Sequence, residues 1–213
     1  MTQLQDRFSS LWRRCAAPKE ALNTQNVWRD IRDFYGEKHR VYHTLQHIEY
    51  CLAALDRAAD EVEHVDAVEL SIWFHDIIFR PGQADNELKS AEYFSQVAKD
   101  VLSPSLVSHV RELIMATMHH HHKIKPPISL DSQFMVDIDL SSFGLDEKDF
   151  AQNTRDLRQE QPEQSDEEFR RSTEAFFRSL LQRDRIFYTP YFFNQLENKA
   201  RQNIFSALNK LAQ

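Results

Sequence analysis

The sequence predicts an all-α protein, a helical bundle that forms one domain over residues 1–213. Apolar residues recur at three- and four-residue spacing along the chain, and no segment alternates convincingly as a strand would. The chain has only 3 glycines, fewer than a β-rich or doubly wound fold normally uses in turns and phosphate-binding loops. No repeat, low-complexity linker or change in composition divides the chain, which favours a single domain.

Start and stop signals divide the first half of the chain into five amphipathic segments. Pro18 and Gly36 end the first two, and Thr24 is the N-cap of the second. Asp66 followed by Glu69 resembles a capping box, which predicts that another helix begins directly afterwards. The five expected helices cover about residues 4–15, 24–35, 44–55, 67–79 and 85–101.

The second half contains five more expected helices. Ser103-Pro104-Ser105 opens the first of them, and Lys125-Pro126-Pro127 closes that stretch. Thr189 followed by Pro190 is a good start signal, because proline is well tolerated at the first helical position. These helices cover about residues 104–117, 131–143, 150–157, 166–181 and 190 onward.

The charge and hydropathy of the chain exclude some classes of function. Its formal net charge of -7 argues against broad nucleic-acid binding, which needs a positive surface. A small anionic ligand stays compatible with that charge, because a metal site creates its own local field. No apolar run approaches about 18 residues, so we expect no segment to span a membrane.

The cysteines and the N-terminal charges predict a cytoplasmic protein. Cys15 and Cys51 lie in helical segments without metal or redox spacing, which favours buried free thiols in a reducing compartment. Charges at Asp6, Arg7 and Arg13 are unlike those of a signal peptide. The sequence leaves the formation of a homo-oligomer open.

Four clusters place ligand-type side chains among apolar residues, at positions 42–47, 73–79, 118–122 and 136–140. Each has an ordinary structural interpretation when taken alone. His47 would be a hydrogen-bonded core residue, and His75 with Asp76 would be a structural ion pair. The histidine run would be a solvated helix end, and Asp137 and Asp139 would be helix caps. An ionised carboxylate such as Asp76 is costly to bury, however, unless it is paired or coordinates a metal.

Taken together, the clusters indicate a metal site. A histidine, an adjacent His–Asp pair and a distant aspartate, each on its own helix, form a mixed nitrogen and oxygen set suited to a divalent cation. Asp137 and Asp139 cannot both face that cation, because two helical residues differ by about 200° in direction. Asp139 follows Met135 by four residues on an apolar side, whereas Asp137 has Gln133 and Ser141 at that spacing. We therefore expect Asp139 to bind the metal and Asp137 to form hydrogen bonds.

The order H…HD…D resembles the HD phosphohydrolase superfamily, with ligand helices over about residues 40–145. Finer motifs resemble one branch, the predicted metal-dependent HD phosphohydrolases of bacteria: Tyr-His-Thr-Leu-x-His, Trp-Phe-His-Asp, Asp-Asn-Glu, Ala-Thr-x-x-His and Asp-x-Asp-Leu. The likeness continues into residues 185–189 and 197–204. It implies an HD-type bundle with additional C-terminal helices over about residues 146–213, and a divalent metal ion (Mn, Mg, Fe, Co, Ni or Zn).

The resemblance also implies roles for particular residues. The metal ligands would be His47, His75, Asp76 and Asp139. Ile138-Asp139-Leu140-Ser141 resembles the Ala-Asp-Leu-Ser at this ligand in related cyclic-nucleotide phosphodiesterases, where a histidine four residues before the first ligand protonates the leaving group. His43 occupies that place. The branch's usual Arg-x-Glu-Tyr occurs here as Arg158-Gln159-Glu160-Gln161, and we find no motif for a cyclic-dinucleotide pocket.

The predicted function is therefore hydrolysis of a phosphoester of a small molecule or nucleotide by metal-bound water, with His43 as general acid. Asp76 would be catalytic as a metal ligand. Glu87 would orient water or a ligand, or would simply favour the helix dipole as a first-turn acid. The anionic substrate would contact His119, His120 and Arg158, while Lys123 and Lys125 are more typical of a solvated surface.

Two alternatives belong to other classes of protein. An HD-fold di-iron oxygenase would bind its second iron through extra histidines, which residues 119–122 could supply. A non-catalytic protein would keep the metal for ligand binding or for stability. Oxygen consumption would identify the first alternative, and ligand affinity without turnover would identify the second.

Overall fold

The structure is a computed structural model that describes residues 3–17, 24–119 and 128–211. These residues form ten α-helices and two 3₁₀ helices and contain no strand, which confirms the all-α prediction. The α-helices are α1 (Gln3–Cys15), α2 (Thr24–Tyr35), α3 (Leu45–Ala58), α4 (Val65–Phe74), α5 (Asn86–Ala98), α6 (Pro104–Ala116), α7 (Leu130–Leu140), α8 (Glu147–Gln159), α9 (Asp166–Leu181) and α10 (Pro190–Leu211). The 3₁₀ helices are η2 (Ala59–Glu61) and η3 (Ser141–Gly144).

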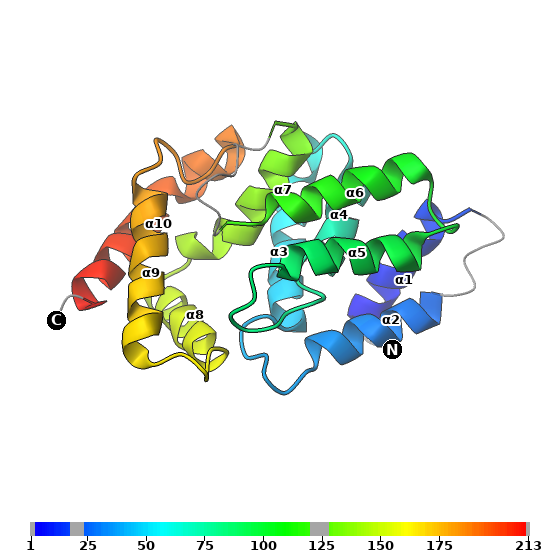
Figure 1. The fold of residues 1–213 in the computed structure, drawn as a ribbon. Helices are drawn as coiled ribbons and strands as arrows, with labels where there is room; N and C mark the ends of the chain where they lie inside the picture. Colours follow the sequence, from blue (N-terminus) through cyan, green and yellow to red (C-terminus); the bar gives the residue numbers. More distant parts are fainter. Residues whose placement is uncertain (1–2, 18–23, 120–127, 212–213) are drawn as a thin grey trace.

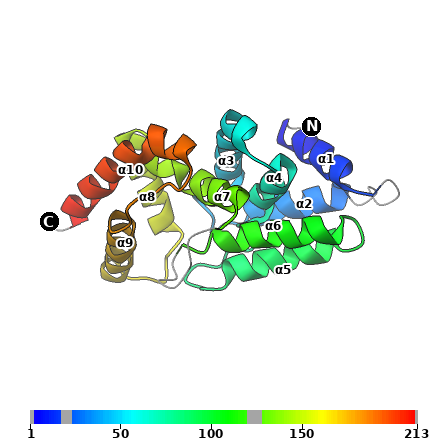
Figure 2. The same cartoon turned by 90° about the horizontal axis from the view of Figure 1, so that it is seen from above.

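The helices form two groups joined through α7. Helices α1–α6 lie on one side of α7, and α8–α10 lie on the other (Figures 1 and 2). The first group surrounds an aromatic core in which Phe8 lies within 6.3 Å of the rings of Trp12, Trp73 and Phe74. In the second group, α10 packs against η3 and α9. The predicted C-terminal helices therefore lie beside η3, the segment that directly follows Asp139 and Leu140.

Helix α4 lies at the centre of the first group, and every residue from Ala67 to Phe74 is buried. The predicted capping box is wrong, because His64 precedes the helix without a side-chain cap bond. Glu69 instead pairs with Arg7, whose Nε lies 2.8 Å from Oε1. The helix is thus stabilised by packing and by this half-buried ion pair rather than by a local cap.

The predicted end of this helix at Phe79 is also wrong, since α4 ends at Phe74. The buried Arg40 guanidinium donates hydrogen bonds to the carbonyl oxygens of Asp76 (2.7 Å) and Ile77 (2.8 Å). Ser90 Oγ accepts the N–H of Ile78 at 3.1 Å. These side chains replace the helical partners of the backbone, so the chain leaves the helix where the His–Asp pair occurs.

Other helix ends differ from the prediction by a few residues. Helix α5 ends at Ala98 rather than Val101, and Asp100 follows in the left-handed region with φ 63°. Asp85 makes no cap bond and pairs with Lys89, while the Asn86 side chain bonds both backbone groups of Arg80 at 3.0 Å. Helix α8 begins three residues before its predicted start. The predicted stop at residues 125–127 lies outside the described residues.

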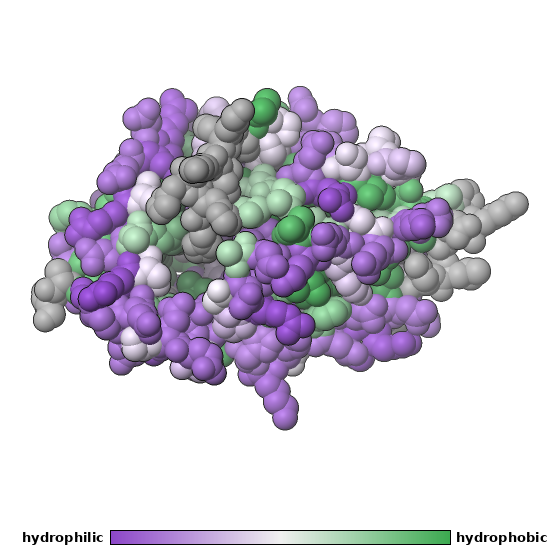
Figure 3. All heavy atoms as spheres, in the orientation of Figure 1, coloured by the Kyte–Doolittle hydropathy of each residue, from purple (hydrophilic) through white to green (hydrophobic). Residues whose placement is uncertain are grey.

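The visible surface in Figure 3 is hydrophilic over most of its area, with apolar residues interspersed. Within the described segments, no helix has both the length and the apolar character needed to cross a membrane. Both cysteines are free: Cys51 is buried, as predicted, whereas Cys15 is only half-buried.

Candidate metal centre

Four ligand-type side chains from three parts of the chain converge at one point. His47 lies in the first turn of α3, His75 and Asp76 directly follow α4, and Asp139 is the penultimate residue of α7. Each offers one ligand atom, and these atoms all lie within 4.8 Å of one another, so this group could hold a metal ion. We call these residues the HHDD cluster. The structure brings together all four residues that the sequence singled out as ligands.

The spacing and chemistry of the HHDD cluster fit a divalent cation. His75 Nε2 lies 2.9 Å from Asp76 Oδ2 and 3.3 Å from His47 Nε2, and Asp139 Oδ1 lies 3.4 Å from His47 Nε2. Ligands about 2.1 Å from one cation lie roughly 3.0–3.5 Å apart in octahedral or tetrahedral geometry. Two imidazole nitrogens with two carboxylates suit zinc, iron, cobalt, nickel or manganese.

The backbone orients one of the imidazoles. His75 Nδ1 lies 2.9 Å from the carbonyl oxygen of Ile72, which can only accept a hydrogen bond. Nδ1 therefore carries the proton, and Nε2 presents its lone pair to the HHDD cluster when the ring is neutral. The side chains of His47 and His75 are both 1% exposed, so little water competes for these nitrogens.

The electrostatics of the HHDD cluster also favour a cation. Burial by itself raises the pKa of Asp76, but the His75 and His43 imidazoles outweigh it and hold that pKa below its ordinary value. The pKa of Asp139 is lowered in the same way, against burial, by hydrogen bonds from neighbouring histidines. Burial by itself lowers the pKa of His75, yet Asp76 and Asp139 raise it well above its ordinary value. The two carboxylates thus attract positive charge, which protons or a divalent cation can supply.

Beside the HHDD cluster, His43 is held by a residue to which the sequence prediction gave no role. The buried Glu160 at the end of α8 accepts, through Oε2, a hydrogen bond from His43 Nδ1 at 2.6 Å. Its Oε1 accepts the N–H groups of residues 41, 42 and 43 at 2.7–2.9 Å. Residues 158–161 keep the Arg and the Glu of the Arg-x-Glu-Tyr motif, and this partial match was the signal that could have identified Glu160.

His43 lies in the turn before α3, so Glu160 and Phe79 position it rather than a shared helical face with His47. Its ring stacks on Phe79 with centroids 4.2 Å apart, and its Nε2 lies 3.9 Å from Asp76 Oδ2. Burial by itself lowers the pKa of His43, but Asp76 and Glu160 outweigh it and raise that pKa above its ordinary value. Nδ1 is thus turned to Glu160, and Nε2 faces the HHDD cluster.

The structure brings two further predicted residues to the HHDD cluster. His119 Nε2 lies 2.8 Å from Asp139 Oδ2, on the side of the carboxylate away from His47. Glu87, in the first turn of α5, lines the adjoining cavity, and burial raises the pKa of its carboxyl. His120, Lys123 and Lys125 lie outside the described residues.

Arg158, predicted to bind substrate, is not brought to the HHDD cluster. Its guanidinium pairs with Asp166 at 2.7 Å and donates to the carbonyl oxygens of Gln161 (2.8 Å) and Gln164 (3.0 Å). It also lies over the Phe169 ring, 5.4 Å from the ring centroid, and it closes the turn between α8 and α9.

Asp137 and Asp139 face opposite sides of α7, as predicted from their spacing. Asp137 accepts hydrogen bonds from Tyr188 N (2.8 Å), Thr189 N (2.7 Å) and Thr189 Oγ1 (2.7 Å). This confirms the predicted hydrogen-bonding role, although the residue is fully buried, with an exposure of 0%. Burial raises the pKa of Asp137 to about 7, against the lowering effect of these bonds. Asp137 therefore fixes the segment that leads into α10.

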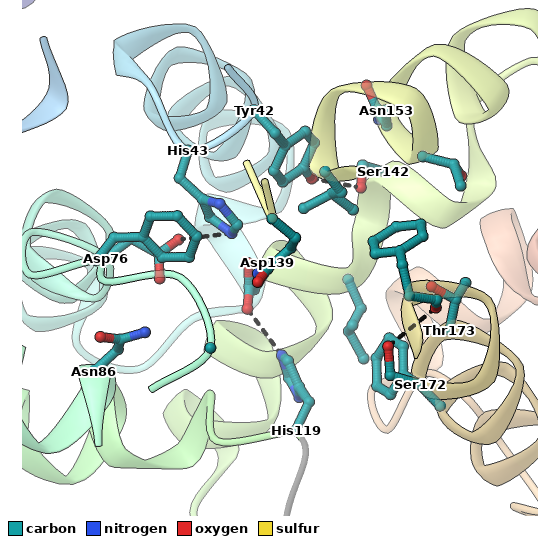
Figure 4. A pocket seen from close by; sticks show the side chains of 18 of the residues that line it. Tyr42, His43, Asp76, Asn86, His119, Asp139, Ser142, Asn153, Ser172 and Thr173 are labelled. Atoms are coloured by element: carbon teal, nitrogen blue, oxygen red, sulfur yellow. Dashed lines mark hydrogen bonds and ion pairs between the residues drawn. The ribbon is translucent and has the colours of Figure 1, made fainter. Parts of the chain in front are cut away.

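A cavity of about 470 Å³ opens beside the HHDD cluster. Figure 4 shows His43, Asp76, Asp139 and His119 on one side of it. Neutral polar side chains, including Asn153 and Thr173, lie on the opposite side. Its volume is within the range of roughly 300–1,000 Å³ that is usual for small-molecule sites.

A second group of residues, away from this cavity, could also hold a metal ion: His64, His109 and Asp131. Asp131 Oδ2 lies 2.7 Å from His64 Nδ1 and 3.1 Å from His109 Nε2. Its Oδ1 accepts the backbone N–H groups of Glu63 and His64, both at 3.1 Å. Asp131 thus fixes, from α7, the backbone turn that leads into α4.

The chain was compared with known proteins in three ways. No protein-family model, no curated protein and no solved structure matches it. The resemblance to the HD phosphohydrolase superfamily accordingly stays a prediction from the motifs, and a function is proposed below from the geometry of the HHDD cluster and its cavity.

Proposed function

We propose that the protein is a metal-dependent phosphohydrolase of the HD kind, which cleaves a phosphoester of a small molecule. One observation carries this proposal: two imidazoles and two carboxylates converge at the inner end of a cavity, beside a histidine whose other nitrogen is bonded to a buried glutamate. His47, His75, Asp76 and Asp139 would hold the cation. A bound divalent cation supplies Lewis acidity toward a phosphoryl oxygen and lowers the pKa of water.

The neighbouring side chains suit the proton transfers of such a reaction. Glu160 accepts a hydrogen bond from His43 Nδ1 and stabilises the imidazolium, so Nε2 can give its proton to the leaving oxygen. Phe79 stacks on the ring and restricts its rotation. Glu87 lines the same cavity and would orient a water molecule through its carboxyl.

Reconstitution of the metal-depleted protein tests this function. The protein is loaded in turn with Mn, Mg, Fe, Co, Ni or Zn, and phosphate release is measured against a panel of phosphomonoesters and nucleotides. We expect turnover with at least one metal and none after chelation. Bound ligand without phosphate release for any loaded metal would instead identify a non-catalytic binding protein.

One observation favours a second candidate, a dinuclear oxygenase. Asp139 Oδ1 faces His47 and His75, while its Oδ2 faces His119 at 2.8 Å. A carboxylate with partners on both oxygens can bridge two cations about 3.5–4 Å apart. Two irons per chain, together with oxygen uptake that is lost in His119→Ala, would establish this candidate. One metal per chain without oxygen uptake would exclude it.

A further inference from the structure

We infer that the cavity beside the HHDD cluster binds the alcohol part of the substrate, and that this part is an apolar alkyl or aryl group carrying a single phosphate. The place of the phosphate rests on the proposed function. The character of the cavity wall is independent of that function.

Apolar side chains from four helical segments, α7, η3, α8 and α9, form the apolar wall of the cavity. They are Leu140, Phe143, Phe150, Leu157, Phe176 and Phe177. The Phe143 ring lies 5.6 Å from Phe150 and 6.2 Å from Phe176 between centroids, so the rings support one another. Phe143 and Phe176 are nevertheless only partly buried. Their uncovered surface faces the cavity, where an apolar group would remove it from water.

The charges around the cavity favour a ligand with few negative charges. Asp76, Glu87 and Asp139 line its inner end, and no lysine or arginine is among the lining residues that the structure describes. Arg158, on the adjacent α8, uses its guanidinium in bonds to Asp166 and to two carbonyl oxygens. A single phosphate can be neutralised by a cation in the HHDD cluster. The additional phosphates of a triphosphate would lie near these carboxylates, with no lysine or arginine among the described lining residues to pair with them.

The polar groups on the far side of the cavity are neutral. Asn153, Ser172 and Thr173 lie opposite the HHDD cluster in Figure 4 and could accept water or a hydroxyl group, but they offer no charge. The cavity therefore combines one charged end, a middle lined by aromatic rings and a neutral rim. Monophosphates of apolar alcohols have the matching arrangement, with charge at one end and apolar surface along the rest of the molecule.

Alkyl phosphates of increasing chain length test the inference through turnover. Ethyl, butyl and hexyl phosphate have alcohols of nearly equal acidity, so chain length changes burial rather than leaving-group chemistry. Each buried methylene contributes about fourfold, so the four added methylenes should raise kcat/KM roughly 200-fold from ethyl to hexyl phosphate. Equal values along the series, or a preference for ATP over hexyl phosphate, would overturn the inference.

Binding of 2-naphthol to the metal-free protein tests the cavity without hydrolysis. Fluorescence titration should show saturable binding that Phe176→Ser weakens at least tenfold. Phe193→Ser is the matched control, because Phe193 is also half-buried but lies on α10 over Arg185, outside the cavity lining. Thr173→Lys, which places a charge at the rim, provides a second variant that does not alter the aromatic cluster and should also weaken binding.

The two measurements separate the inference from the proposed function. If 2-naphthol binds as described but no phosphoester is cleaved, the cavity assignment stands and the phosphohydrolase proposal fails. If phosphoesters are cleaved but 2-naphthol does not bind, or binds equally well to all variants, the cavity assignment fails and the phosphohydrolase proposal stands.

Discussion

The two aspartates of α7 show how the direction of a single side chain decides its role. Asp139→Asn removes a charged ligand at almost unchanged size, so the bound metal should be lost. Asp137→Asn should keep the metal but place an amide N–H₂ against the donors of Tyr188 and Thr189, which should lower the free energy of unfolding by about 1–3 kcal/mol. Elemental analysis and thermal unfolding of both variants measure these effects. Loss of metal from Asp137→Asn alone would contradict the assignment.

His43 permits a test of chemistry apart from metal binding. His43→Ala should keep the metal and lose roughly 10²–10⁴-fold in kcat, because only the proton donor is removed. Glu160→Gln should keep the metal and also shift the pH dependence of kcat, since the imidazolium loses its carboxylate partner. Metal content and pH–rate profiles distinguish these outcomes. A fall in metal content in parallel with activity would identify His43 as a ligand or a structural residue.

The half-buried Cys15 gives a test of pKa. Burial and the neighbouring Asp66 raise the pKa of its thiol to about 12. At pH 8 the thiolate, which is the reactive form, should therefore be roughly a thousandfold scarcer than for a free cysteine, and alkylation should accelerate as the pH rises. Iodoacetamide labelling of the native protein, compared with labelling in denaturant, measures this. Rapid labelling of native Cys15 at pH 8 would contradict it.

At the scale of elements, the apolar periodicity predicted the number of helices and the approximate place of each. It failed at the end of α4, because the apolar residues 77–79 continue the pattern of a buried helix beyond the His–Asp pair. What ends the helix is Arg40, about 35 residues earlier in the sequence, which bonds the carbonyl oxygens of Asp76 and Ile77. No local signal records a partner that distant, so the end of α4 could not be predicted from its own residues.

Arg40 should consequently be important for stability and for the metal centre. Its buried guanidinium also bonds the carbonyl oxygen of His43 at 3.2 Å. Arg40→Ala should lower the free energy of unfolding by more than about 3 kcal/mol, because buried carbonyl groups lose charged donors, and should weaken metal binding. Denaturant unfolding of Arg40→Ala and of Arg40→Lys measures the effect, with Lys expected to restore part of it. Unchanged stability in Arg40→Ala would contradict this role.

At the scale of the whole molecule, the order of His47, His75, Asp76 and Asp139 was enough to predict the HHDD cluster. A buried carboxylate needs a partner, and the order of the ligand-type residues along the chain indicated that this partner is a metal ion. The cavity was not predictable in the same way, because phenylalanines such as Phe143 and Phe176 have the helical spacing of ordinary core residues. Their rings line the cavity and are only partly buried, which depends on how η3, α8 and α9 pack in the folded protein.

A bound cation would join three segments of the chain, at α3, after α4 and on α7. Metal should therefore raise the melting temperature, and a metal concentration a hundred times Kd corresponds to about 2.7 kcal/mol of added stability. Thermal unfolding with and without a chelator measures the shift. His64→Ala, in the second group of possible ligands, should keep most of it, whereas His75→Ala should abolish it. An equal loss in both variants would contradict the location of the main site.

The bond between Glu160 and His43 spans 117 positions of the sequence. During synthesis, residues up to about 145 leave the ribosome first, and they already contain every member of the HHDD cluster. Glu160 and the part of the cavity wall that α8 and α9 contribute emerge later. A nascent chain could therefore acquire its cation early but would complete its proton donor only after α8 has docked. Maturation of activity would then follow the C-terminal third of the polypeptide.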